Sequence, residues 1–184
     1  AFAAATALAL AVASLREFRT FEVHAVAVFG LHLSNKANDT LAPQSQSPLV
    51  TIAGRPGLRR LAITDCTLLG HGLLREILAS VTTENPGLQV LNLAPTPLCS
   101  EPFDDAHGLG RAAGALLKEL RQLKYLRLSW CELREDGVLE ILSCLEESGI
   151  GSSSLREVDL RQNGIGRTAE KLRLELRRHS PGLQ

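Results

Sequence analysis

The sequence is poor in aromatic residues and carries no excess of charge of either sign. Its 184 residues include five Phe, one Trp and one Tyr, and 20 basic residues balance 20 acidic ones. A base-stacking surface for single-stranded nucleic acid needs several aromatic side chains. A balanced net charge gives no global field that would attract polyanions or acidic membranes. We therefore expect neither nucleic acid nor a membrane among the partners.

The motifs of catalysis and cofactor binding are also missing. No two of the four cysteines show Cys-x-x-Cys spacing, and the five histidines belong to no metal-binding or nucleophile motif. There is no nucleophile elbow, no phosphate-binding loop and no dinucleotide fingerprint. Asp104, Asp105 and His107 could hold a metal, but a solvated acidic loop is the more ordinary interpretation. We expect no enzyme activity, no metal, no cofactor and no small-molecule substrate.

Methionine is absent, which indicates that residue 1 is not an initiator and that the chain is a fragment or a processed product. Residues 1–14 form an uncharged apolar run that is shorter than the about 20 residues needed to cross a bilayer. The run is expected to be the outer helix of a preceding structural unit, and the alternative is a signal-peptide remnant, which would make the protein secreted. Unpaired cysteines favour the cytoplasm or nucleus.

What the sequence does contain is a recurring leucine pattern. Residues 123–133, LKYLRLSWCEL, place leucines at the fourth and sixth positions, as on the inner face of a short strand. Cys131 takes the ninth position, where a small polar side chain can bond the turning backbone. Copies begin at residues 58, 88, 123 and 155, so the steps are 30, 35 and 32 residues. One copy cannot bury its own leucines, but stacked copies can.

Apolar residues at helical spacing fill the segments between the copies. We expect helices over 71–81, from about residue 111, and after the copies at 123 and 155. Their predicted inward residues are Leu73, Leu74, Ile77, Leu78 and Val81; Ala112, Ala115, Leu116 and Leu120; Val138, Leu139, Ile141, Leu142 and Leu145; and Ala169, Leu172, Leu174 and Leu176. An insertion is expected at 99–110, and a flexible joint at 149–154.

Long copies that alternate a strand with a true helix resemble the ribonuclease-inhibitor-like class of leucine-rich repeat proteins. The resemblance covers residues 55–184 and, more weakly, 15–54. It is carried by Leu58, Leu61, Ile63 and Cys66; by Leu123, Leu126, Leu128 and Cys131; and by Leu155, Val158, Leu160 and Asn163. The class implies an α/β solenoid with a curved parallel sheet on the concave face and helices on the convex face. Ribonuclease inhibitors, NOD-like receptor sensors, tropomodulin-like proteins and some F-box proteins use such repeats to hold proteins.

The resemblance suggests two regions. Residues 1–54 are expected to form one or more degenerate N-terminal repeats, with a polar loop at 34–48 replacing an outer helix, and residues 55–184 to form regular repeats cut from a longer solenoid. The register of residues 15–33 stays open. Leu15 and Phe18 could open a repeat there, or Val23, Val26, Val28, Leu31 and Leu33 could fill the pattern.

The concave face is the place where a partner is expected. The candidate partner-binding residues are Tyr125, Arg127, Trp130, Asp159, Arg161 and Arg60. The only Tyr and the only Trp fall in one copy beside Arg127, and these three residue types are enriched in interface hot spots. Alternatively, both aromatic rings only pack on neighbouring repeats. We expect a module that binds a protein partner; the alternatives are spacer or scaffold repeats of a larger multidomain protein, or a secreted recognition domain.

Overall fold

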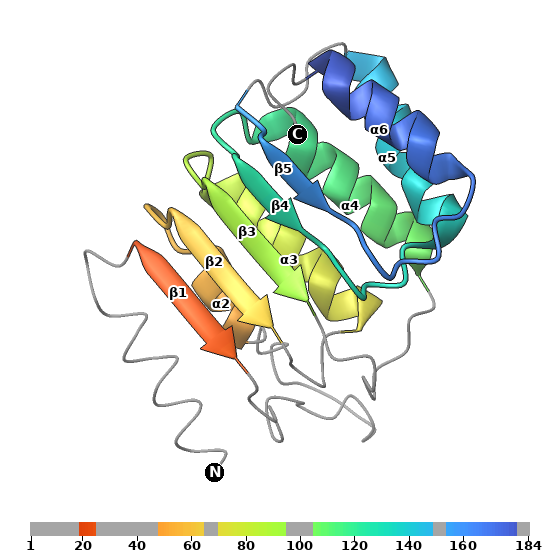
Figure 1. Ribbon diagram of the computed structural model, residues 1–184. Coiled ribbons are helices and arrows are strands. Elements are labelled where there is room, and N and C mark those ends of the chain that lie inside the picture. Colours follow the sequence, from red (N-terminus) through yellow and green to blue (C-terminus); the bar gives the residue numbers. More distant parts are fainter. Residues whose placement is uncertain (1–18, 25–47, 65–69, 95–104, 149–153, 180–184) are drawn as a thin grey trace, which may run out of the picture.

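The computed structural model describes residues 19–24, 48–64, 70–94, 105–148 and 154–179, which form an α/β fold (Figure 1). The elements in chain order are β1 (Thr20–His24), α2 (Pro48–Ala53), β2 (Arg60–Thr64), α3 (His71–Glu84), β3 (Val90–Ala94), α4 (Ala106–Glu119), β4 (Tyr125–Arg127), α5 (Arg134–Ser148), β5 (Glu157–Asp159) and α6 (Thr168–His179). No helix within these ranges is long and apolar enough to cross a membrane.

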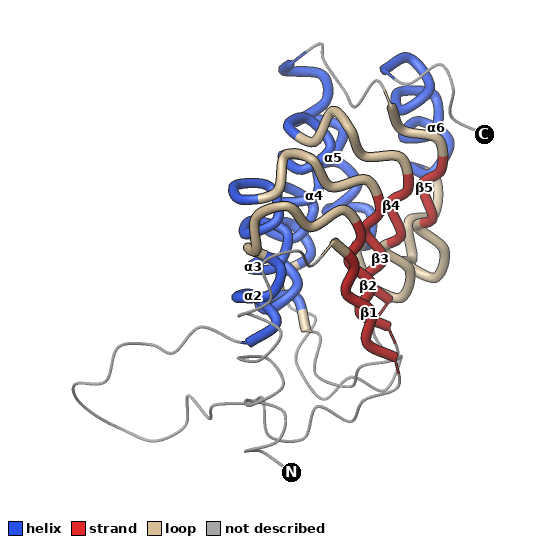
Figure 2. The backbone as a smooth tube through the Cα atoms, turned by 90° about the vertical axis from the view of Figure 1, so that its left-hand side faces the viewer, coloured by secondary structure: helices blue, strands red, loops and turns tan. Residues whose placement is uncertain are grey.

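The strands form one parallel sheet in which each strand lies beside the next one in the chain. The order is β1-β2-β3-β4-β5, and every neighbouring pair is parallel. Helices α2, α3, α4 and α5 lie along one face of this sheet, so the fold has two layers, and α6 lies at the end of the stack beside β5 (Figure 2). We call the opposite face of the sheet the strand face. The predicted α/β class with a parallel sheet is confirmed.

The register aligns the predicted strand positions in rows. Leu61 pairs with Leu91, Leu91 with Leu126, and Leu126 with Val158. The three leucines are buried beneath the helices, and Val158 is partly buried. Side chains alternate along a strand. The residues between these apolar positions therefore point to the strand face.

Both predicted registers for the first strand are wrong. The structure pairs Phe21 with Leu61 and Val23 with Ile63. The first alternative would have put Phe18 opposite Leu61, and the second would have put Val26 there. Phe21 and Val23 therefore take the strand positions in register with Leu61 and Ile63. Residues 15–33 are rich in apolar residues and fit several registers, and pairing with β2 decides among them.

Helix α3 agrees with the expected helix, but the other helices require corrections. Leu139 and Leu174 were predicted to face inward and are 47% and 51% exposed. Helix α4 begins at Ala106 rather than near residue 111, because the Asp105 side chain caps it by accepting a hydrogen bond from Gly108 N at 2.8 Å. The buried residues of α4 include Leu109, Ala113 and Leu117, which the expected stripe omitted.

Helix α2 was not expected at all. Its Pro48 belonged to the predicted polar loop that was to replace an outer helix. Four of its six residues are buried in the core, namely Leu49, Val50, Ile52 and Ala53. Proline at the first helical position costs no hydrogen bond, because that N–H has no intrahelical partner. Residues 1–14, 34–47 and 149–153 lie outside the described residues.

Helices α4 and α5 approach each other closely through glycine. A Cβ atom on Gly110 would lie 2.0 Å from the Gly137 carbonyl oxygen, and one on Gly114 would lie 2.6 Å from Cys144 Cβ. Only glycine at these positions allows the two helix backbones to pack at this distance.

We predict that Gly110→Ala lowers the free energy of unfolding by about 2 kcal/mol, because the new methyl group would push α5 away. Urea denaturation followed by circular dichroism measures the change. Gly72→Ala in α3 is the control, since a Cβ there meets nothing within 4 Å and alanine is the better helix former. Equal stabilities for the two variants would contradict the close packing.

Candidate functional site

The strand face of β4 and β5 brings four of the predicted site residues together. Tyr125 and Arg127 belong to β4, and Asp159 belongs to β5 directly opposite Arg127. Arg161 follows two residues later and turns back to the Asp159 carboxylate. Tyr125 is 41% exposed at the start of the same strand. The sheet register therefore places an aromatic ring, two guanidinium groups and a carboxylate on one surface.

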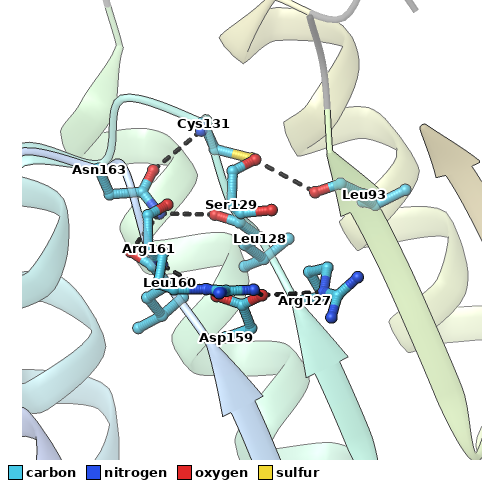
Figure 3. A network of polar contacts seen from close by, with 9 residues as sticks. All are labelled: Leu93, Arg127, Leu128, Ser129, Cys131, Asp159, Leu160, Arg161 and Asn163. Atoms are coloured by element: carbon cyan, nitrogen blue, oxygen red, sulfur yellow. Dashed lines mark hydrogen bonds and ion pairs between the residues drawn. The ribbon is translucent and has the colours of Figure 1, made fainter. Parts of the chain in front are cut away.

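Asp159 is the centre of this group, because both arginines bind its carboxylate (Figure 3). Arg127 Nε lies 2.9 Å from Oδ2. Arg161 donates from Nε to Oδ1 at 2.9 Å and from Nη2 to Oδ2 at 2.8 Å, which is a bidentate contact. The hydrogen bonds from Arg161 hold the pKa of the Asp159 carboxyl below its ordinary value, with the charge of Arg127 adding to the effect. The carboxylate therefore stays ionised and keeps both arginines in place.

In this group the negative charge is buried and the two positive charges are exposed. The Asp159 side chain is 7% exposed, whereas the Arg127 and Arg161 side chains are 43% and 77% exposed. One buried negative charge thus holds two outward positive charges, and the exposed Glu157, which pairs with Tyr125 in the sheet, adds a second carboxylate to this surface. Arg127 meets Asp159 through Nε, and no described residue bonds its Nη1 or Nη2. These nitrogens are donors that an external carboxylate or carbonyl oxygen could use.

Asn92 lies beside these donors, but its side-chain oxygen is closed off from solvent. It lies on β3 in register with Arg127. Its Oδ1 atom is buried and has no hydrogen-bond partner among the described residues. A buried polar atom without a partner costs free energy. Because this atom is buried, a ligand on the strand face does not reach it, and the missing partner is a cost carried by the fold.

Two predicted site residues lie apart from this group. Trp130 is 41% exposed and lies in the turn after β4, beyond the strand that carries Tyr125 and Arg127. Arg60 lies on β2, two strands from Arg127, and forms an ion pair with Glu22 of β1. We define the strand-face cluster as Tyr125, Arg127, Asp159 and Arg161.

The turns after β4 and β5 are fixed by the residues at the ninth position of the leucine pattern. Asn163 Oδ1 accepts hydrogen bonds from Cys131 N at 2.9 Å and Leu133 N at 3.3 Å. Its Nδ2 donates to the carbonyl oxygens of Leu128 at 2.6 Å and Leu160 at 2.8 Å (Figure 3). Cys131 is buried and its thiol faces the Leu93 carbonyl oxygen at 3.6 Å. The inward, backbone-bonding role predicted for this position is confirmed for both residues.

We predict that Asn163→Ala costs about 3 kcal/mol of unfolding free energy, because it leaves three buried backbone groups and one partly buried carbonyl without their partner. Asn92→Ala should cost less than about 1 kcal/mol, since the Asn92 oxygen has no described partner to lose. Chemical denaturation of both variants measures the difference. A loss at Asn163 no larger than that at Asn92 would show that the turn does not depend on the amide.

His71 was not recognised from the sequence as a structural residue, yet it joins three elements. It is buried at the start of α3. Its Nδ1 accepts from Asp105 N at 2.9 Å, so the ring proton is on Nε2, which donates to the Cys131 carbonyl oxygen at 2.7 Å. Burial lowers the pKa of His71 below 6.5, although the Cys131 carbonyl and the charge of Asp105 act against this shift.

This lowered pKa predicts a loss of stability in mild acid. When the pH falls through 6.5, the unfolded chain binds a proton at His71 that the folded chain does not. The contribution is therefore fully present above this pH and is lost as the pH falls. We expect the free energy of unfolding to be about 1 kcal/mol lower at about pH 5.5 than at about pH 7.5. The difference should shrink in His71→Gln and persist in His107→Gln, and a difference unchanged by His71→Gln would refute the assignment.

The candidate metal ligands have other partners where the structure describes them. The Asp105 side chain caps α4 and pairs with Arg75, and His107 Nδ1 lies 3.2 Å from Glu140 Oε1. No group of three potential metal ligands occurs within the described ranges. Cys131 is a free thiol, and burial raises its pKa, which makes it an unreactive core group. Asp104, Cys66 and Cys99 lie outside the described residues.

No protein-family model matches the chain, and a search of curated proteins finds no relative.

Proposed function

We propose that this chain is part of a leucine-rich repeat solenoid of the ribonuclease-inhibitor-like class. Three observations support this. Strands follow each other in sequence order in a parallel sheet, helices α2 to α5 lie along one face of it, and apolar residues of successive copies pair in register. The inward Cys131 and Asn163 at the turns fit the same class. In this proposal the strand face is the concave face of the solenoid.

We propose further that the strand face binds a protein partner, and the strand-face cluster carries this proposal. Arg127 and Arg161 are held in place by the buried Asp159 carboxylate, so they lose little conformational entropy when they meet a partner. Tyr125 provides an exposed aromatic surface next to them. Tyrosine and arginine are the residue types that most often dominate protein interfaces. The free thiol of Cys131 favours a reducing compartment for this interaction.

Affinity capture from a cell lysate tests the proposal. The baits are the wild-type chain, a cluster variant Tyr125→Ala/Arg127→Gln/Arg161→Gln, and a control variant Leu174→Ala/Arg173→Gln/Arg178→Gln on α6. The control removes two arginines and an exposed apolar side chain from the helix layer. We expect a protein that is retained by the wild type and the control, and whose affinity for the cluster variant is about 100-fold lower, as for loss of hot-spot residues.

Two further measurements make the result interpretable. Circular dichroism melts show that all baits fold. Asp159→Asn keeps both arginines but removes the charge that positions them, so its affinity should fall between those of the wild type and the cluster variant. If every bait retains the same proteins, the strand face is idle and the repeats are a spacer or scaffold of a larger protein.

A further inference from the structure

A row of basic residues runs along the edge of the sheet where the strands begin. Arg19, Arg59, Gln89, Lys124 and Arg156 each directly precede a strand. Their backbones are joined in order, since Arg59 N donates to Arg19 O at 2.8 Å, Gln89 N to Arg59 O at 2.9 Å, Lys124 N to Gln89 O at 2.8 Å and Arg156 N to Lys124 O at 2.8 Å. Figure 1 shows these strand starts aligned along one edge. We call the five residues the basic ridge.

The positive charges of the basic ridge are not neutralised by the described residues. Arg59 Nη1 donates to the Gly87 carbonyl and to Gln122 Oε1, and Lys124 Nζ lies 3.3 Å from Gln89 Oε1. These partners are neutral. None of the four cations forms an ion pair with a carboxylate in the part of the chain that the structure describes, although its other arginines pair repeatedly. Arg19, Arg59 and Arg156 are exposed.

This arrangement is unfavourable unless an anion is nearby. Adjacent strands are about 4.8 Å apart, and like charges on neighbouring strands repel each other. The ends of helices α3 and α4 lie at the same sheet edge, and their carbonyl groups offset part of the repulsion. Within the described part of the chain, Arg59 is the one ridge cation whose side chain donates to a backbone carbonyl at this edge, that of Gly87. A bound anionic chain would neutralise the whole row.

We infer that the basic ridge binds an extended acidic segment of a protein. Four strand steps separate Arg19 from Arg156, which is about 19 Å. An extended peptide of about six residues covers this distance. Arginine binds carboxylates through two parallel hydrogen bonds, which suits Glu and Asp side chains. The ridge itself contains no aromatic side chain, and Tyr125, which follows Lys124, is a single exposed ring, whereas a base-stacking surface needs several.

Fluorescence anisotropy with the full chain at low salt tests this inference. The probe is a fluorescein-labelled peptide of about twelve residues made of Glu, Asp and Gly. A peptide with Gln and Asn in place of the acids and an oligothymidylate of about twelve nucleotides are the comparison probes. The ridge variant is Arg59→Gln/Lys124→Gln/Arg156→Gln. Glutamine already occupies the ridge at position 89, so the substitutions are compatible with the fold.

The matched control is Arg173→Gln/Arg177→Gln/Arg178→Gln on α6, which changes the net charge by the same amount. We expect the wild type and the control to bind the acidic peptide within twofold of each other and the ridge variant to bind about tenfold more weakly. Equal binding by all three proteins, or no binding by the wild type, would overturn the inference. Tighter, ridge-dependent binding of the oligothymidylate would also overturn it, by assigning the ridge to nucleic acid.

The inference is separate from the proposed role of the strand face. Arg127→Gln/Arg161→Gln leaves the ridge intact and should keep at least half of the affinity for the acidic peptide. If this variant loses the peptide while the ridge variant keeps it, the strand-face cluster is the acidic-peptide site and the ridge is not. If the ridge variant alone loses the peptide, the ridge assignment stands whatever the capture experiment finds.

Discussion

The structure depends on burying one continuous layer of aliphatic side chains between the sheet and the helices. Leu61, Leu91 and Leu126 pair across β2, β3 and β4 and are all buried. A strand of three to five residues followed by one helix has too little apolar surface to fold alone. Each βα unit is therefore stable only when its neighbours cover it. The backbone ladder, the turns and the strand-face residues all follow from this stacking.

Stacking explains why so much of the fold was predictable. The spacing of Leu58, Leu61 and Ile63 recurs through the chain, and a regular recurrence fixes strand positions and register together. The errors occur where the recurrence is weak. Phe21 and Val23 lie in an apolar run that fits several registers, and Leu139 lies next to Val138, so either could face the core by helical spacing alone. Packing against the neighbouring unit decides between them, and a single sequence does not contain that information.

The strand-face cluster was predictable in part for the same reason. Once the register is known, Arg127 must lie opposite Asp159. Alternation then sends both side chains away from the helices. The pairing of Asp159 with Arg161 was not predictable. Arg161 lies beyond the end of β5, so strand alternation does not say where its side chain points, and the structure shows that it folds back to the Asp159 carboxylate. The basic ridge was not predicted from the sequence. The net charge is balanced, and a net charge does not say how the charged residues are distributed in space.

The strained backbone conformation of Trp130 could result either from the fold or from a role in binding. Trp130 has φ +63°, in the left-handed region that bulky residues rarely adopt. Such a conformation costs about 1 kcal/mol or more and often marks a functional residue. However, Gln162 holds the equivalent position one unit later with φ +61°. The hydrogen bond from Trp130 N to the Arg161 carbonyl also ties one turn to the next. The strain therefore belongs to the repeated turn, and only the exposure of the ring bears on whether Trp130 contacts a partner.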